Sequence, residues 1–178
     1  DLIGVFRVVE GGAFKARLIP VTVYKGKVTG EIWIGGFSNK YGPIDTMTVG
    51  ESYLLFLNKV KKYKSRYGSS SNAGDQSIAQ ASYEASLFVR SQKNGYFVPT
   101  PTSGEYHVID DKVFIDLAEI NNRIEGFPLE DVGLLIESNS KRNDNGFVEH
   151  CKTEIRKNLT TRNGYLLTNY LSALELVS

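Results

Sequence analysis

The segment Lys59–Tyr67 combines the residue types that bind polyanions. It carries five positive charges and two tyrosines, although the formal net charge of the whole 178-residue chain is only +1. Cationic side chains attract phosphates and aromatic rings stack on bases, and OB-folds that hold single strands use both. The candidate ligand-binding residues are Lys59, Lys61, Lys62, Tyr63, Lys64, Arg66 and Tyr67.

Three interpretations of this basic segment stay open. The charges could simply keep the chain soluble where it leaves a buried strand. They could instead bind an anionic glycan, lipid or wall polymer, or they could bind nucleic acid. The near-zero net charge favours none of them, because only a local patch could attract such a ligand.

The remaining reactive residue types do not form a catalytic pattern. The two histidines are His107 and His150, and Cys151 is the single cysteine, so no intramolecular disulfide can form. Adjacent side chains diverge on a helix or a strand, so His150 and Cys151 cannot act together as base and nucleophile. We expect a structural role for His107 and a buried position for Cys151.

Metal and phosphate sites are also not predicted. One loose acidic group lacks the regular spacing of a calcium loop, and we interpret it as a solvated turn: Asp110, Asp111, Asp116 and Glu119. The pairs Gly11-Gly12 and Gly35-Gly36 lack the lysine and the helix start of a phosphate-binding loop. The sequence therefore predicts a protein without enzymatic activity or a cofactor.

The elements that position the basic segment begin with a strand at Ser52–Asn58. Both of its faces are apolar, which predicts that it is covered on both sides at the centre of a core. Earlier strands are predicted at Leu2–Val9, Lys15–Tyr24 and within Gly30–Gly36. Pro20 predicts an edge or a bulge in the second of these, where Val21 and Val23 share an apolar face with Ile19.

The second half of the chain changes in character. Residues 59–93 form a long polar connection, in which Ser77–Val89 fits either a helix or a pair of strands. Short strands are predicted at Tyr96–Val98, Tyr106–Ile109 and Val113–Ile115, with a hairpin turn at Asp110-Asp111. Helices are then predicted from Pro128, around His150–Leu159 and over the apolar stripe that ends the chain: Leu167, Tyr170, Leu171, Leu174 and Val177. This order indicates a small β-barrel or sandwich with helices against one side.

Several short motifs occur in the order of a known family. They are Val21-Thr22-Val23-Tyr24-Lys25-Gly26, Glu31-Ile32-Trp33-Ile34 and Gly50-Glu51-Ser52-Tyr53-Leu54-Leu55-Phe56-Leu57, after Asp1-Leu2-Ile3 and Arg7-Val8. Over residues 1–58 the chain resembles the bacterial netrin-like modules related to tissue inhibitors of metalloproteinases. The resemblance implies a mainly β (α+β) protein with a five-stranded, OB-like Greek-key barrel over residues 1–116. It places a long loop between strands four and five, at 59–93, and leaves 117–178 as a helical extension packed on the barrel.

The resemblance also implies a location and a function. Members of this family are mostly secreted or cell-surface proteins, so we expect an extracellular, periplasmic or cell-surface binding module whose signal peptide has been removed, with the cytoplasm as the alternative. Its partner would be an unknown protein or an anionic polymer, and nucleic acid is an alternative ligand. Inhibition of a metalloproteinase is a further alternative, but the N-terminal Cys-x-Cys that caps the protease zinc is absent here. No apolar run reaches the roughly 18 residues that span a bilayer.

Overall fold

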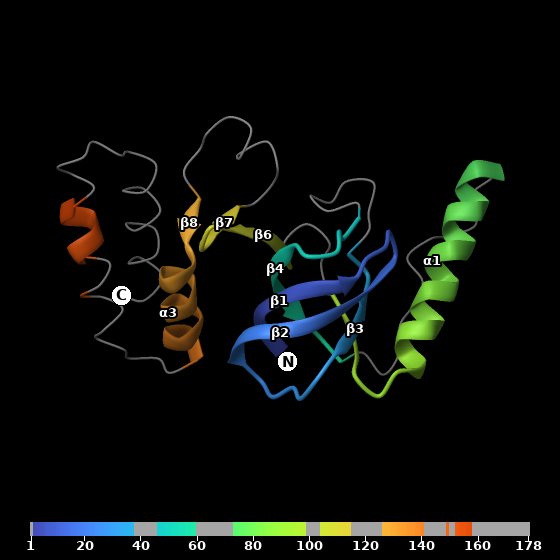
Figure 1. Ribbon diagram of the computed structural model, residues 1–178, viewed down its shortest axis with the longest axis horizontal. Helices are drawn as coiled ribbons and strands as arrows, with labels where there is room; N and C mark the ends of the chain where they lie inside the picture. The colour runs from blue at the N-terminus through green and yellow to red at the C-terminus, as the bar shows by residue number, and fades with distance from the viewer. Residues whose placement is uncertain are drawn as a thin grey trace. The chain divides into compact units, whose positions relative to one another are not determined.

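The computed structural model describes residues 2–37, 46–59, 73–98, 104–114, 126–140, 149 and 152–157. Its strands form one eight-stranded sheet in the order β5-β3-β2-β1-β4-β6-β7-β8. Figure 1 shows the described helices and strands along the chain. The chain divides into two compact units, Asp1–His107 and Val108–Ser178. The mainly β class with helices that the sequence predicted is confirmed.

Strand β4 (Ser52–Leu57) lies in the interior of the sheet, between β1 (Leu2–Glu10) and β6 (Glu105–Ile109). It pairs with β1 in an antiparallel register from Leu2–Leu57 to Arg7–Ser52. Side chains on both of its faces are buried, because Leu54 is 2% exposed and its neighbour Leu55 is fully buried. The prediction of a central strand covered on both sides is therefore confirmed.

Strand β2 (Lys15–Lys25) is long, and its pairing with β1 is interrupted at Pro20, where the sequence predicted an edge or a bulge. Phe6 pairs with Pro20 and Val5 pairs with Thr22, so one residue of β2 is left over as a bulge. The predicted apolar face beyond this point is not buried: Val21 is 50% exposed and Val23 is 37% exposed. The side chains of β2 that enter the core instead precede the bulge, at Ala16 and Leu18.

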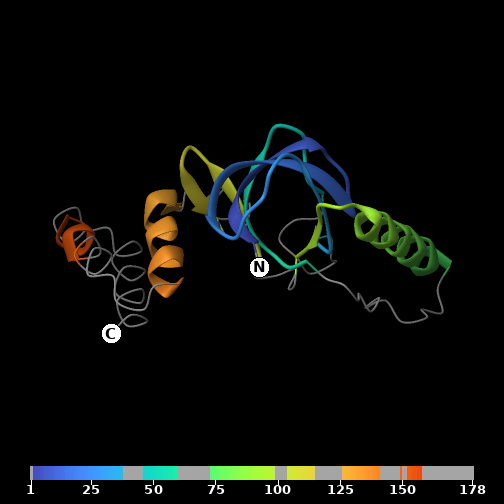
Figure 2. The ribbon, with the colours of Figure 1, turned by 90° about the horizontal axis from the view of Figure 1, so that it is seen from below.

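Two short strands complete the pairing of the first unit. Strand β3 (Ile32–Gly35) is antiparallel to the start of β2 and parallel to β5 (Gly95–Phe97). Phe97 also forms a bridge with Asn58, the residue after β4, through two reciprocal backbone hydrogen bonds of 2.9 Å. In Figure 2 strands β1 to β4 curve around a common interior. Its fully buried apolar side chains include Phe6, Leu18, Ile32, Ile34, Phe37, Tyr53 and Leu55.

Helix α1 (Ala73–Ser91) occupies the stretch that the sequence left open between a helix and a pair of strands. It ends just before β5, and a tight Gln92-to-Gly95 connection joins the two elements. An added Cβ at Gly95 would collide with the carbonyl oxygen of Val89, so this close approach of helix and strand requires glycine.

The second unit contains the end of β6 and the remaining described strands and helices. Strands β6 and β7 (Lys112–Phe114) flank the predicted turn, where Asp110 and Asp111 both have positive φ angles, 49° and 58°. Two such residues are the signature of a type I′ hairpin turn. Strand β8 (Phe127–Pro128) pairs with β7 and leads directly into α3 (Leu129–Ser140), and residues 152–157 are helical.

The strand arrangement differs in detail from the expected five-stranded barrel. The assigned sheet has eight strands and is open, with β5 and β8 at its edges. The extra strands arise because the chain contains short pairing segments on both sides of residue 100, and because β7 and β8 extend the sheet past β6.

Candidate binding pocket

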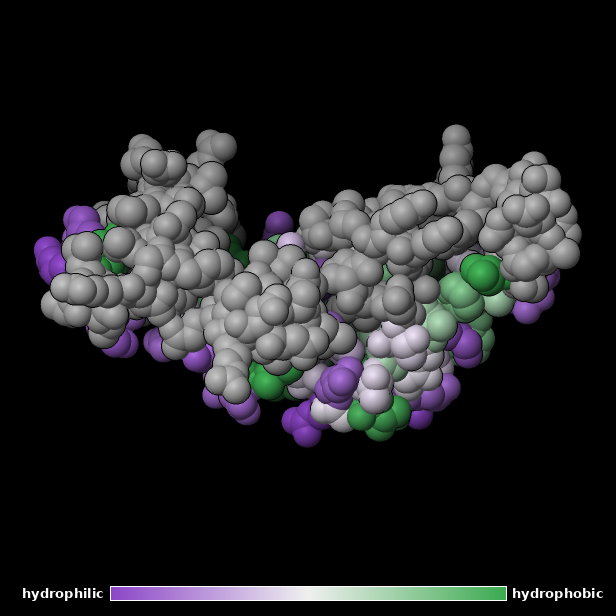
Figure 3. Space-filling model, turned by 90° about the horizontal axis from the view of Figure 1, so that it is seen from above, coloured by the Kyte–Doolittle hydropathy of each residue, from purple (hydrophilic) through white to green (hydrophobic). Residues whose placement is uncertain are grey.

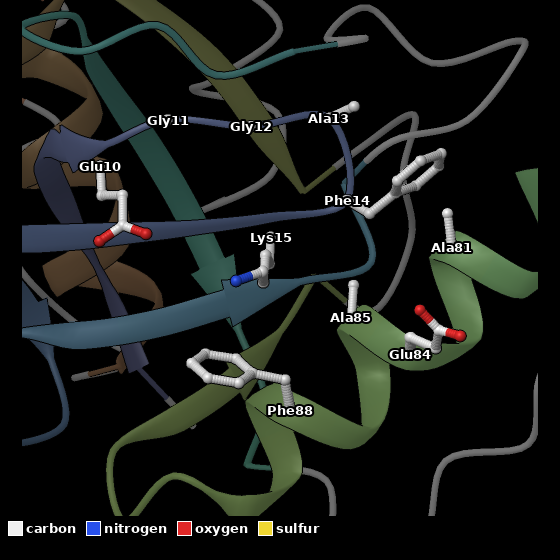
Figure 4. A pocket seen from close by; sticks show the side chains of 10 residues that line it. All are labelled: Glu10, Gly11, Gly12, Ala13, Phe14, Lys15, Ala81, Glu84, Ala85 and Phe88. Atoms are coloured by element: carbon white, nitrogen blue, oxygen red, sulfur yellow. The ribbon is translucent and has the colours of Figure 1, made fainter.

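A pocket of about 420 Å³ lies between the β1–β2 turn and helix α1, wholly within the first unit (Figure 4). This volume is in the range of pockets that hold small ligands or single large side chains. The turn contributes Glu10, Gly11, Gly12, Ala13, Phe14 and Lys15, and the helix contributes Ala81, Glu84, Ala85 and Phe88.

The turn side of the pocket is held in place by its two glycines. The backbone groups of Gly12 and Met47 form reciprocal hydrogen bonds of 3.1 and 3.2 Å. A Cβ at Gly11 would collide with the carbonyl oxygen of Met47, so only glycine allows this close approach. Because Met47 is fixed in the core, these contacts fix the turn and Phe14 behind it.

The helix side presents small side chains to the turn. Ala81 and Ala85 are one helical turn apart, and in Figure 4 their methyl groups point toward the β1–β2 turn. Ala85 is buried, whereas Ile78 on the same face of the helix is 49% exposed. The apolar face of α1 thus continues beyond the part of the helix that the sheet covers, and the alanines leave room for another group.

Aromatic and cationic side chains clamp the end of α1 onto the sheet. The ring of Phe88 meets the ring of Trp33 edge-on, with centroids 4.7 Å apart. The amino group of Lys15 lies 4.1 Å from the Phe88 centroid and 5.0 Å from the Trp33 centroid. Arg17 lies 5.8 Å from the Trp33 ring and forms ion pairs with Glu10 at 3.3 Å and Glu31 at 2.8 Å.

This geometry supports binding through apolar contact with charges at the rim. The ionisable side chains that line the pocket are Glu10, Lys15 and Glu84, and Glu84 accepts a hydrogen bond of 2.6 Å from Gln80. The pocket lining contains neither histidine nor cysteine. Hydrophobic surface is also visible along the part of the molecule that α1 forms (Figure 3). On this helix the side chains of Tyr83 and Leu87 are nearly half exposed.

The structure places one of the basic residues that the sequence singled out. The amino group of Lys59 donates a hydrogen bond of 2.9 Å to the carbonyl oxygen of Lys93 and lies 5.6 Å from the Tyr96 ring centroid. The other candidates lie outside the described residues: Lys61, Lys62, Tyr63, Lys64, Arg66 and Tyr67. The binding role of this segment therefore stays a prediction.

The other residues considered for chemistry are partly described. His107 is buried beside Tyr53, with ring centroids 5.0 Å apart. The described residues contain no group of three or more side chains placed to hold a metal ion. Four of the residues considered for chemistry fall outside the described ranges: Asp116, Glu119, His150 and Cys151. The helix predicted over the apolar stripe from Leu167 to Val177 also falls outside them.

Sequence reasoning missed this pocket and also missed a buried carboxyl group at Glu105. The pocket left a faint signal, because Ile78, Ala81, Ala85 and Phe88 recur at helical spacing. Glu105 left none, because it stands among polar residues just before the apolar residues of β6.

Comparison of the chain with protein-family models, with curated proteins and with solved structures finds no match in any of the three. Among the helices that the structure describes, none has the length and apolar character needed to cross a bilayer.

Proposed function

We propose that this protein is a non-enzymatic binding module that captures a protein partner in the pocket between the β1–β2 turn and α1. The observation that carries the proposal is the pocket itself: about 420 Å³ of space beside two helix alanines, on an apolar helix face that the sheet only partly covers. The occupant we infer is a large apolar side chain on a partner polypeptide. Lys15 and Glu84 at the rim would select its charged neighbours.

The scaffold of this module is an OB-like barrel, the fold that the netrin-like resemblance implies. We interpret β5 and β6 as two parts of one fifth strand. Supporting this, β5 is parallel to β3 and Phe97 bridges Asn58 at the end of β4. Further along, the amide of Phe56 donates to the carbonyl of Gly104, just before β6. These contacts run in opposite directions along the two strands, as an antiparallel fifth strand beside β4 requires.

The affinity of such a site depends on how much apolar surface the occupant buries. Each Å² of buried apolar surface contributes roughly 25 cal/mol, so one aromatic side chain in the pocket supplies a few kcal/mol. Ile78, exposed on the same helix face, would extend the contact along the partner. Many interfaces concentrate their binding energy in one side chain that enters a preformed pocket.

The test uses the full chain as bait to select peptides from a random displayed library. The affinity of the selected peptides is then measured for two variants. Ala81→Trp fills the pocket, whereas Leu87→Trp adds the same ring to a helix position outside the pocket lining. We expect Ala81→Trp to weaken the selected peptides at least tenfold and Leu87→Trp to leave their affinity unchanged. If peptides bind both variants and the parent chain equally, the pocket is not the binding site.

A second candidate function is polyanion binding through the basic segment, and the position of Lys59 favours it. Its amino group lies near the buried Tyr96 ring and donates a hydrogen bond to Lys93, which fixes in place the first cation of the segment. Titration with a single-stranded oligothymidylate at increasing salt tests this function. The apparent dissociation constant should rise steeply with salt, and binding that ignores salt would exclude it.

A further inference from the structure

The carboxyl group of Glu105, at the start of β6, is buried without a partner. Its residue has no exposed surface, and neither carboxyl oxygen has a hydrogen-bond partner among the described residues. A carboxylate in such a place lacks both water and compensating charge, so the group takes up a proton instead. Burial accordingly raises the pKa of Glu105 from its ordinary value of 4.5 to about 9.

Titratable side chains on β4 and on β6 itself lie near Glu105. On the facing strand β4, Tyr53 is fully buried, and its hydroxyl group donates a hydrogen bond to Glu51. On β6 itself, His107 shares the inward face, while burial and the charge of Glu105 raise the pKa of Tyr106. Burial, the bond to Glu51 and the Glu105 charge likewise raise the pKa of Tyr53.

The other neighbour of β6 is β7, whose only charged residue is Lys112. Lys112 follows the two-residue turn and so lies opposite Ile109, at the far end of β6 from Glu105. Burial is the cause of the raised pKa of Glu105.

We propose that Glu105 is a proton-linked latch, which holds β6 against β4 while its carboxyl group is protonated and favours release of β6 when the proton is lost to solvent. The latch is independent of what the pocket binds. Glu105 belongs to the first unit, which ends at His107.

The sign of the pH dependence follows from the two states of the group. The folded chain holds the proton up to about pH 9, and the unfolded chain releases it near pH 4.5. The stabilisation is therefore complete below pH 4.5 and declines as the pH rises toward 9. Over this interval one proton changes the unfolding equilibrium constant by about tenfold per pH unit.

The experiment measures urea unfolding of the full chain from pH 5 to 8.5 by the fluorescence of Trp33, the only tryptophan, which lies in the first unit. Glu105→Gln keeps the shape of the side chain and cannot ionise. We expect the unfolding constant of the parent chain to rise about tenfold per pH unit relative to that of Glu105→Gln. The control Glu84→Gln removes an exposed carboxylate and should keep the parent slope.

A second measurement tests the proposal even if the Glu105→Gln variant does not fold. Carbon-13 NMR of glutamate-labelled parent protein should show one carboxyl resonance that keeps its protonated shift above pH 7. Glu105→Met, which carries no polar group there, should lack that resonance. Equal slopes for the parent and Glu105→Gln, or parent carboxyl groups that all titrate below pH 6, would overturn the proposal.

Discussion

Replacing Phe88 by alanine should release helix α1 from the sheet and abolish the pocket. The Phe88 ring is the part of α1 that meets Trp33, at 4.7 Å and an interplanar angle of 81°, and it also lies under the amino group of Lys15. Ala85 and Phe88 both line the pocket, so a helix that moves away from the sheet removes one wall of it. The same substitution therefore tests how the fold positions the site.

The magnitude can be estimated from these contacts. An edge-on aromatic pair contributes about 0.5–1.5 kcal/mol beyond burial. A partly exposed cation–π contact adds about 0.5–1 kcal/mol. With some lost apolar burial, we expect Phe88→Ala to lower the free energy of unfolding by about 2–3 kcal/mol. This is less than the roughly 3–5 kcal/mol of a fully buried phenylalanine, because Phe88 is only half-buried.

The assay combines urea unfolding, followed by Trp33 fluorescence, with hydrogen exchange of the α1 amides. Phe88→Ala should shift native Trp33 emission to the red and speed exchange in α1. The matched control is Leu87→Ala, the preceding residue, which is 46% exposed and should change stability by less than about 0.5 kcal/mol. Equal effects of the two substitutions on α1 exchange would show that the Trp33–Phe88 contact does not hold the helix.

Four further substitutions test the core and its connections. Leu55→Ala should lower the free energy of unfolding, measured in urea, by about 2–5 kcal/mol, and Phe56→Ala should lower it by less, because Leu55 is fully buried and Phe56 is not. The reverse order would contradict the assigned inner face of β4. Gly95→Ala should lower the midpoint of thermal unfolding by several degrees, since its methyl group would strike the Val89 carbonyl, and an unchanged midpoint would show that the helix can shift freely. Arg17→Lys should lower the free energy of unfolding by under about 1 kcal/mol, because the two ion pairs of Arg17 are partly exposed, and 1 M salt should abolish the difference. A loss of stability that does not depend on salt would point to packing on Trp33 instead.

The central strands could be predicted because a strand that is buried on both faces has apolar residues at nearly every position. Every position from Tyr53 to Leu57 is apolar, and an edge strand or surface helix would not tolerate this. Pro20 also predicted its own bulge correctly, since a residue without an amide hydrogen cannot continue a ladder. At these positions local chemistry determines structure with little help from the rest of the chain.

The exposure of Val21 and Val23 could not be predicted in the same way. A bulge shifts the alternation of a strand by one residue, so the face that a following valine occupies depends on where the extra residue is inserted. Strand β3 pairs with β2 only from Lys15 to Leu18, and among the described residues no other strand pairs with the second half of β2 on that side. The length of the strand that pairs with β2 depends on the tertiary fold, and the composition of β2 does not reveal it.

Helix α1 and the buried Glu105 were hidden for different reasons. The helix is rich in alanine and serine, so its apolar face is weak, and only its contacts with Trp33 and β5 identify the side that is buried. Glu105 is a charged residue type that sequence reasoning places at the surface. Its burial results from its position opposite the inner face of β4, which no local pattern specifies.

The candidate pocket arises from a mismatch in length between two elements. Helix α1 has 19 residues and is about 28 Å long, whereas β3, one of the strands it packs on, has four residues and spans about 13 Å. The helix therefore extends beyond the strand, and its apolar face is exposed toward its N-terminal end, at Ile78. The β1–β2 turn, fixed by the Gly12–Met47 bridge, stands opposite this uncovered face but does not fill the space in front of Ala81. The pocket therefore follows from the lengths of these elements, and the Ala81→Trp variant tests the binding role proposed for it.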